Sequence, residues 1–408
     1  MSGNFQLDEK LILIFLLIVF SLSLTIPSIH FLNDISVKIF IFISVLTIGF
    51  SFSKLVSLKI NTPGFLEFLF LMLLTAFCIT CFYINLENNL NSYSLFSILT
   101  YVINFVLFFF ILGKNFRINT TKFDKFTDII IYFAIVLSLI SLIFYIQGIH
   151  FLSLYSHTSA GLFGHPNTTS MFYTISIPVL FYKFFTKRIS NVVFTCLLIL
   201  FLSVLLLTLS RAGYIGVGVG ILIYTFYKSR TLFVFVSILV AIVAMTIVLD
   251  FASSKVDSSA SRLLLILSAI SVITRSNSSL MWGYGPVNGT NIFIQEKFFF
   301  GNEPVPNPHN LLLQLSIQFG LIFTLLAVLT VIVLFVKGMI LKFRDERFKY
   351  DQRLSLCLTI MLSLIVQNFF EDVLVNPIYY VMPVFFIFSG FVYYSIKLKN
   401  KFIPVAIQ

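Results

Sequence analysis

Long apolar runs alternate with short polar segments along most of the chain. A bilayer core of about 30 Å needs roughly 20 apolar residues per helix, so the pattern predicts about twelve membrane spans. Backbone polar groups cannot stay unpaired in lipid, and each span is therefore expected to be an α-helix. The predicted spans lie near residues 11–29, 36–56, 64–84, 94–113, 128–147, 170–186, 190–209, 211–227, 231–251, 310–336, 354–370 and 375–396.

The longest polar stretch follows the ninth apolar run and covers residues 252–308. One apolar run interrupts it at residues 263–274, and this run is too short to cross a bilayer. We expect it to form a helix that lies at the membrane interface. The chain is thus predicted to contain transmembrane helices 1–9 in residues 1–251, a large loop, and the last three transmembrane helices with a tail in residues 309–408.

The composition supports this organisation. The chain has 408 residues, of which 59% are hydrophobic and 11% are charged, whereas soluble domains carry about 25% charged residues. The expected fold class is therefore an all-α polytopic membrane protein. The four cysteines all lie within apolar runs, so Cys78 and Cys81 are interpreted as small apolar side chains rather than a redox or metal site.

The distribution of basic residues orients the predicted spans. The formal net charge is +11, and most of the lysines and arginines fall in segments that follow every second span. Lysine and arginine collect in cytoplasmic loops, which predicts cytoplasmic termini and places residues 252–308 outside. Because the topology accounts for the positive charge, it gives no reason to expect a nucleic-acid partner.

All five histidines fall on the predicted external side. His309 stands just before the tenth span, where a neutral imidazole with a pKa of about 6.5 is suited to take a proton from a hydroxyl group. A capping or interfacial role fits the spacing of His309 equally well, and a structural role is favoured for His165. Glu371 and Asp372, at the external end of the eleventh span, are the nearest carboxylates that could either orient such a base or hold an acceptor.

Three external arginines are candidate anion ligands. Arg211 begins the eighth span. A charged side chain at that depth in the membrane is unfavourable in free energy unless it has a partner or a function. Helix N–H groups and a guanidinium together form a site suited to phosphate. Arg262 and Arg275 flank the interfacial helix, and either would supply a further cation for a pyrophosphate. The alternatives are snorkelling for Arg211 and interfacial anchoring for the other two.

Several common catalytic signatures are missing from the sequence. It contains no Walker A motif, no Rossmann glycine loop and no G-x-S-x-G, and its histidines do not form H-x-x-x-H or H-E-x-x-H. We therefore expect no metal and no cofactor.

Several short motifs, in this order, resemble those of the O-antigen ligase and Wzy-type polymerase superfamily. The motifs are Ser210-Arg211, Arg262, Gly283-Tyr284-Gly285, Pro308-His309-Asn310 and Gly320. Residues 368–372, N-F-F-E-D, are also similar to a segment of some ligases. The likeness covers roughly residues 160–375, and the first five spans match only in hydropathy.

This resemblance implies a metal-independent glycosyltransferase of GT-C-like architecture, located in the bacterial inner membrane with its active site at the periplasmic face. The donor would be a glycan on undecaprenyl pyrophosphate. The acceptor would be lipid A–core in a ligase or a lipid-linked glycan in a polymerase, with the ligase slightly favoured. His309 would activate the acceptor hydroxyl, and Arg211 and Arg262 would bind the pyrophosphate. The expected supporting residues are Arg275, Asn310, Gly283, Tyr284, Gly285, His165, Glu371 and Asp372.

A transporter, such as a lipid-linked glycan flippase, also fits twelve spans with both ends inside. Transporters usually show repeated halves and polar groups near the membrane midplane. Here the polar residues gather at one face and the longest loop follows the ninth span, which favours an enzyme.

Overall fold

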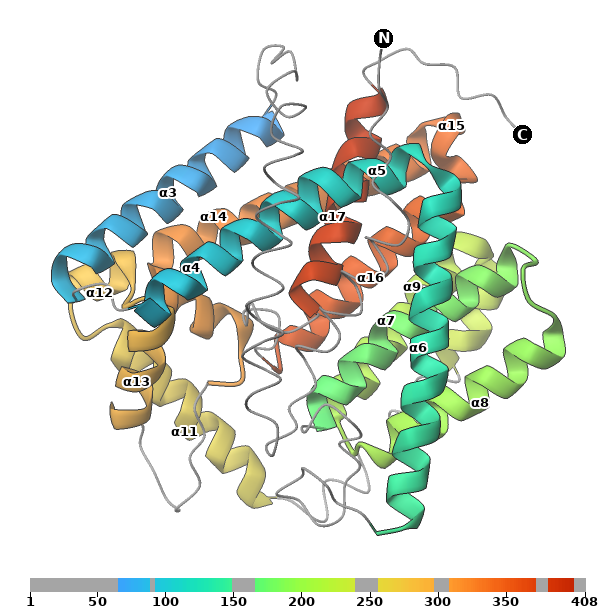
Figure 1. Ribbon diagram of the computed structural model, residues 1–408, viewed down its shortest axis with the longest axis horizontal. Coiled ribbons are helices and arrows are strands. Elements are labelled where there is room, and N and C mark those ends of the chain that lie inside the picture. Colours follow the sequence, from blue (N-terminus) through green and yellow to red (C-terminus); the bar gives the residue numbers. More distant parts are fainter. Residues whose placement is uncertain are drawn as a thin grey trace.

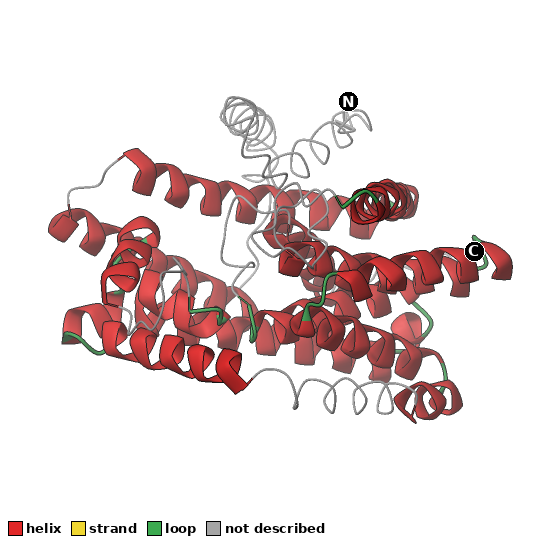
Figure 2. Cartoon of the chain, turned by 90° about the horizontal axis from the view of Figure 1, so that it is seen from below, coloured by secondary structure: helices red, strands yellow, loops and turns green. Residues whose placement is uncertain are grey.

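The computed structural model describes residues 65–88, 92–148, 166–238, 256–296, 308–371 and 381–399. Within these ranges the chain forms helices joined by turns and loops, and no strand (Figure 2). The first two predicted spans lie outside the described residues, as does much of the ninth. The remaining spans can be compared with helices one by one.

Figure 1 shows the described helices, of which the longer ones coincide with the apolar runs. They are α3 (Phe65–Asn88), α4 (Ser92–Asn104), the π-helix η2 (Phe105–Leu112), α5 (Gly113–Ile118), α6 (Thr120–Ile146), α7 (Pro166–Phe185), α8 (Asn191–Leu207), α9 (Arg211–Lys228), α11 (Val256–Ile273), α12 (Asn277–Trp282), α13 (Pro286–Glu296), α14 (Leu311–Arg344), α15 (Glu346–Lys349), α16 (Gln352–Asn368) and α17 (Val381–Lys399).

Five described segments are long and apolar enough to cross a membrane. They are Phe65–Phe82, Ile98–Ile118, Thr120–Ile146, Leu311–Arg344 and Val381–Leu398. The expected all-helical, polytopic membrane fold is therefore confirmed in its class. The total of twelve spans, the GT-C-like architecture and the sidedness of the termini stay predictions.

Short polar side chains mark where the helices begin. The side chains of Asn119, Ser190, Ser210 and Asp351 accept backbone N–H groups from the first turns of α6, α8, α9 and α16. These caps satisfy donors that have no partner inside a helix. In this chain each cap also fixes where a membrane helix meets its polar loop.

The fourth predicted span is longer than its apolar run. The helix continues through η2 into α5, so Lys114 and Arg117 are helical rather than in the expected cytoplasmic loop. Arg117 is 8% exposed, and it can be buried because its Nη1 lies 2.8 Å from Asp351 Oδ2. A distant carboxylate thus allows a charged residue to extend the helix.

Helix α9 packs closely against α7 and α16 through its glycine face. A Cβ at Gly216 would lie 2.8 Å from Gln367 Oε1, and one at Gly220 would lie 2.9 Å from Ser363 Oγ. The G-x-x-x-G spacing predicts such an approach because glycine lets helices come together. This packing brings the polar residues of three helices into one buried layer.

Helix α14 bends at Gly320, whose φ of 77° and ψ of 171° are not helical. The bend takes the carbonyls of Ile317 and Gln318 out of the regular helical ladder. They accept the N–H groups of Tyr284 and Gly285, each at 2.8 Å. The Gly283-Tyr284-Gly285 motif is therefore a backbone clamp on the kink of α14.

The clamp leaves no room for side chains. A Cβ at Gly320 would lie 2.1 Å from Met281 O, and one at Gly283 would lie 2.6 Å from Gly320 N. Both glycines also have positive φ, a region that most other residues avoid. The glycines at both positions of the clamp therefore have a structural cause.

Helices α11, α12 and α13 gather beside the first turns of α14, at the end of α14 away from α15 (Figure 1). They share a hydrophobic cluster that is separate from the main core and includes Leu265, Ala269, Val272, Phe293 and Ile317. The predicted interfacial run lies within α11 and packs on this cluster. Its position at the membrane surface stays a prediction.

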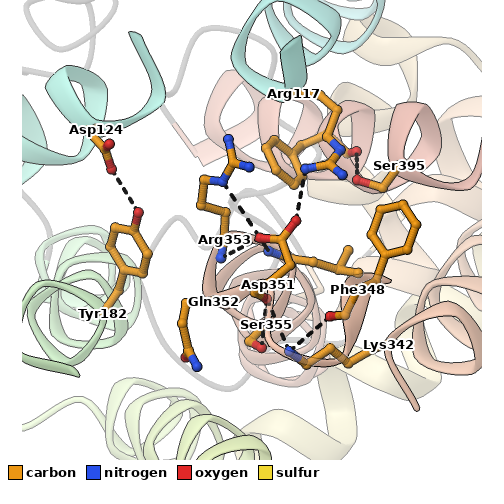
Figure 3. Close-up of polar contacts among 12 residues, drawn as sticks. Arg117, Asp124, Tyr182, Lys342, Phe348, Asp351, Gln352, Arg353, Ser355 and Ser395 are labelled. Carbon is orange, nitrogen blue, oxygen red and sulfur yellow. Dashed lines mark hydrogen bonds and ion pairs between the residues drawn. The ribbon is translucent and has the colours of Figure 1, made fainter. Parts of the chain in front are cut away.

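A cluster of charged residues ties together helix ends that are predicted to face the cytoplasm (Figure 3). Asp351 pairs with Arg117, and Arg353 Nε lies 3.6 Å from Asp351 Oδ1. Lys342 Nζ donates to Lys349 O at 2.6 Å and to Asp351 O at 3.1 Å. These contacts join α5, α14 and the start of α16.

Replacing Asp351 with asparagine should destabilise the protein by about 3–5 kcal/mol, because it leaves the buried Arg117 guanidinium without its carboxylate. Thermal unfolding of the purified protein in detergent measures this effect. The matched control is Glu346→Gln, since Glu346 pairs with Lys349 at 3.1 Å between exposed side chains and such pairs contribute at most about 1 kcal/mol. Equal stability of the two variants would contradict the buried-pair interpretation.

The same pair gives a pH dependence. Burial raises the pKa of Asp351, but Arg117 and Arg353 outweigh burial and hold this pKa below its ordinary value. A lowered folded pKa adds stability above the unfolded pKa of about 4, and this stability is lost as the pH falls through the folded value. The gap in unfolding temperature between the protein and Asp351→Asn should therefore narrow in acid.

Candidate active site

His309 lies in a strained turn immediately before α14. Its φ is 50°, a left-handed conformation that is uncommon in residues other than glycine. The next residue holds this turn in place, because Asn310 Oδ1 accepts the N–H groups of Leu312 and Leu313 at 3.0 and 3.1 Å. Asn310 Nδ2 donates to Phe369 O at 2.9 Å, which fastens the turn to the end of α16.

This fastening places His309 beside Glu371. Nδ1 of His309 lies 3.3 Å from Oε2 of Glu371, and their side chains are 29% and 2% exposed. The carboxylate is thus buried, while part of the imidazole ring faces outward. When Nδ1 carries the proton of a neutral imidazole and donates a hydrogen bond to Glu371, the other ring nitrogen can act as an acceptor. The pair can hold and stabilise an imidazolium.

Asn167, near the start of α7, reaches the other oxygen of Glu371. Its Nδ2 donates to Oε1 of the carboxylate. The backbone carbonyl of Asn167 accepts the hydroxyl of Ser170 at 2.8 Å. Glu371 therefore bridges the His309 turn and the beginning of α7.

Arg211 lies at the start of α9, next to the cap residue Ser210. Ser210 Oγ accepts Gly213 N–H at 3.1 Å and lies 2.9 Å from Ser170 Oγ. Arg211 is partly exposed at this helix start. A continuous series of hydrogen bonds thus connects the helix terminus that carries Arg211 with the His309–Glu371 pair.

The other predicted site residues fall into two groups. Gly283 and Gly285 are buried in the clamp, and Tyr284 donates its hydroxyl to Val272 O at 3.1 Å. Arg275 forms a surface ion pair with Glu296 at 2.5 Å. Arg262 belongs to α11, but its side chain is not described, and His165 and Asp372 lie outside the described residues.

The sequence pattern did not predict Gln367 and Ser170 as site residues. Both are fully buried, and Gln367 Nε2 donates to Ser170 Oγ at 3.1 Å. A signal for Gln367 was present, since a polar residue inside a predicted span needs a partner and it stands one helical turn before Glu371. Its partner on α7 lies 197 positions away and could not be inferred from the pattern.

The described residues contain no group of three or more histidine, cysteine, aspartate or glutamate side chains that could hold a metal ion. His309 and Glu371 form a pair, and the third member of their group is the amide of Asn167. The expectation of a reaction without a metal remains a prediction about the whole chain.

One comparison with known proteins covers part of this region of the chain. Residues 196–328 match the family model Wzy_C, described as O-Antigen ligase. The match contains Arg211, the glycine clamp and His309, while Glu371 and Gln367 lie beyond it. No curated protein matches the chain. Residues 196–328 are thus similar to the Wzy_C domain of the O-antigen ligase family, whose members are glycosyltransferase-like ligases and polymerases that use lipid-linked glycans.

Proposed function

We propose that the protein is a glycosyltransferase of the periplasmic membrane face that moves an O-antigen glycan from undecaprenyl pyrophosphate to an acceptor hydroxyl. The acceptor we favour is lipid A–core, which makes the protein an O-antigen ligase. The observation that carries this proposal is the His309–Glu371 pair, at 3.3 Å, whose histidine lies within the segment that matches the ligase family. The second candidate is a polymerase, which uses the same chemistry with a lipid-linked acceptor.

In the proposed reaction His309 acts as the general base. The ring nitrogen that does not face Glu371 takes the proton of the acceptor hydroxyl as the oxygen attacks the anomeric carbon of the donor. The bond between that carbon and the pyrophosphate oxygen breaks, and undecaprenyl pyrophosphate leaves with the electron pair. Glu371 stabilises the resulting imidazolium, and a positioned base of this kind contributes about 10²- to 10⁴-fold to the rate.

Arg211 is the proposed ligand of the departing pyrophosphate. It stands at the N-terminus of α9, where backbone N–H groups and the helix dipole favour an anion. Arg262 is proposed to act with it, as the family likeness implies. Charge stabilisation of this kind matters most as the pyrophosphate leaves.

Arg211→Ala should weaken donor binding and slow transfer, with Arg211→Lys less affected because lysine keeps the charge but loses the paired donors. We expect KM for the lipid-linked donor to rise about tenfold or more in the alanine variant. The measurement is initial-rate transfer with purified enzyme at varied donor. An unchanged KM together with an unchanged kcat in Arg211→Ala would remove this residue from the donor site.

The lipopolysaccharide ladder of a deletion strain tests the function itself. Loss of all O-antigen from lipid A–core, with polymer accumulating on undecaprenyl pyrophosphate, is the expected result for a ligase. Core carrying one repeat unit would instead identify a polymerase. A normal ladder in the deletion strain would contradict both assignments, and complementation with the wild-type gene is the control.

A further inference from the structure

Four buried side chains from three helices form one hydrogen-bonded cluster behind the His309–Glu371 pair. We call it the Gln367 cluster, and it consists of Gln367 on α16, Ser170 and Thr174 on α7, and Ser210 at the cap of α9. Gln367 Oε1 accepts the hydroxyl of Thr174 at 2.6 Å, and Gln367 Nε2 donates to Ser170 Oγ at 3.1 Å. None of the four is more than 3% exposed.

Every side-chain polar atom of the cluster has a hydrogen-bond partner. A serine hydroxyl has one proton and two acceptor lone pairs. Ser170 accepts from Gln367 Nε2, and its one proton is directed either to Asn167 O or to Ser210 Oγ. Ser210 in turn accepts Gly213 N–H, which caps α9. Each of these contacts is between 2.8 and 3.1 Å.

The two ends of the cluster lead to different parts of the proposed site. Glu371 follows Gln367 by four residues at the end of α16, and it pairs with His309. Arg211 follows Ser210 directly at the start of α9. The cluster therefore lies between the proposed base and the proposed donor ligand.

Close packing of the three helices does not by itself require polar side chains in the Gln367 cluster. Burial of an amide and three hydroxyl groups is costly unless every group is paired, and an apolar side chain of similar volume would fill the space at lower cost. A satisfied polar network fixes one relative arrangement of its helices, because other arrangements leave buried groups unpaired. The close approach of Gly216 to Gln367 and Thr174 shows how closely α9 is held.

We infer that Gln367 is a positioning residue, which holds the Glu371 end of α16 and the Arg211 end of α9 at one fixed separation. The inference rests on the proposed function, in which base and donor ligand act on the same substrate pair. Gln367 itself touches no reacting atom. A shift of about 1 Å between such groups costs up to about 10²-fold in rate.

The first test compares Gln367→Met with Thr359→Val in the purified enzyme. Methionine keeps the volume and loses both hydrogen bonds to α7. Thr359 lies on the same helix, and its buried hydroxyl has no hydrogen-bond partner among the described residues, so valine removes no contact between helices. We expect kcat to fall roughly 10- to 100-fold in Gln367→Met with little change in KM for the donor, and Thr359→Val to retain full activity.

The second test uses two substitutions of Thr174, and its result does not depend on the stability of Gln367→Met. Thr174→Val removes the hydroxyl that Gln367 accepts, whereas Thr174→Ser keeps it and loses only a methyl group. Under the positioning role Thr174→Ser should be several times more active than Thr174→Val, at equal abundance in the membrane. A purely structural role would lower abundance and leave kcat per folded molecule unchanged.

The outcomes distinguish the positioning role from the proposed function. If His309→Ala is inactive while Gln367→Met and both Thr174 variants match Thr359→Val in kcat, the positioning role is wrong and the proposed function stands. If the wild-type enzyme and His309→Ala transfer glycan equally, His309 is not the base, and if the wild-type enzyme transfers no glycan, the proposed function itself is wrong. If His309→Ala is inactive and Gln367→Met loses kcat with its fold intact, both are supported.

Discussion

His309→Ala should reduce glycan transfer by about 10²- to 10⁴-fold, the range that a positioned general base contributes. The loss is expected in kcat, because alanine removes proton transfer while the donor ligands remain. The measurement is the transfer rate of purified enzyme, together with the O-antigen ladder of a complemented deletion strain. Full activity of this variant would show that another group takes the proton.

Glu371→Gln tests whether the charge of the carboxylate contributes to the activity of His309. Glutamine keeps the volume and the hydrogen-bonding reach of the side chain but removes the charge that stabilises the imidazolium. The expected activity lies between those of the wild type and His309→Ala. Glu371 is 2% exposed and contacts Asn167 as well as His309, so unfolding temperature must be measured in parallel. A fully active and stable Glu371→Gln would limit the carboxylate to a structural role.

Gly320→Ala should be strongly destabilising, although it adds only one methyl group. Its Cβ would lie 2.1 Å from Met281 O at a φ of 77°, so the backbone of α12 or α14 must move. The movement would break the hydrogen bonds from Tyr284 and Gly285 to α14. We expect a loss of at least about 3 kcal/mol in stability, within the range of severe core mutations. Thermal unfolding in detergent and recovery from membranes measure it.

Gly148→Ala is the matched control for this substitution. Gly148 also has positive φ, at 64°, but no described atom lies within 4 Å of its added Cβ. Only the left-handed backbone is then penalised, by about 1–2 kcal/mol. If the two variants lose equal stability, close packing at the kink contributes nothing beyond backbone conformation.

Some of the site follows directly from residue patterns. The eighth span is predicted to begin at Arg211, and α9 begins there. The tenth span is predicted to begin near residue 310, and α14 begins at Leu311, but the capping residue is Asn310 rather than His309. The proposal that Glu371 would orient His309 came from its place at the end of a span, and the two side chains do meet. These features could be predicted because they depend on neighbouring residues, or on two segments that are expected at the same face of the membrane.

Other features could not be inferred from the pattern, because they depend on contacts between distant segments. Residues 105–112 are apolar on every side, so no periodicity distinguishes the π-helix from an α-helix. The ion pair of Arg117 with Asp351 joins residues 234 positions apart. The partner of Gln367 is similarly remote. In a chain with few charges, long-range polar pairing determines details that hydropathy leaves open.

The kink in α14 also determines how far His309 lies from the opposite end of this helix. Residues 321–344, beyond Gly320, are long enough to cover about 36 Å along a helix axis at 1.5 Å per residue, which exceeds a hydrocarbon core of about 30 Å. This part alone can cross the lipid, so residues 311–319 can turn aside with the clamp. The length of the helix beyond the kink would then determine the depth of His309 and place it at the level of the lipid headgroups. In the proposed reaction, one added turn would move His309 by about 5 Å, away from the proposed lipid-linked donor at the headgroup level.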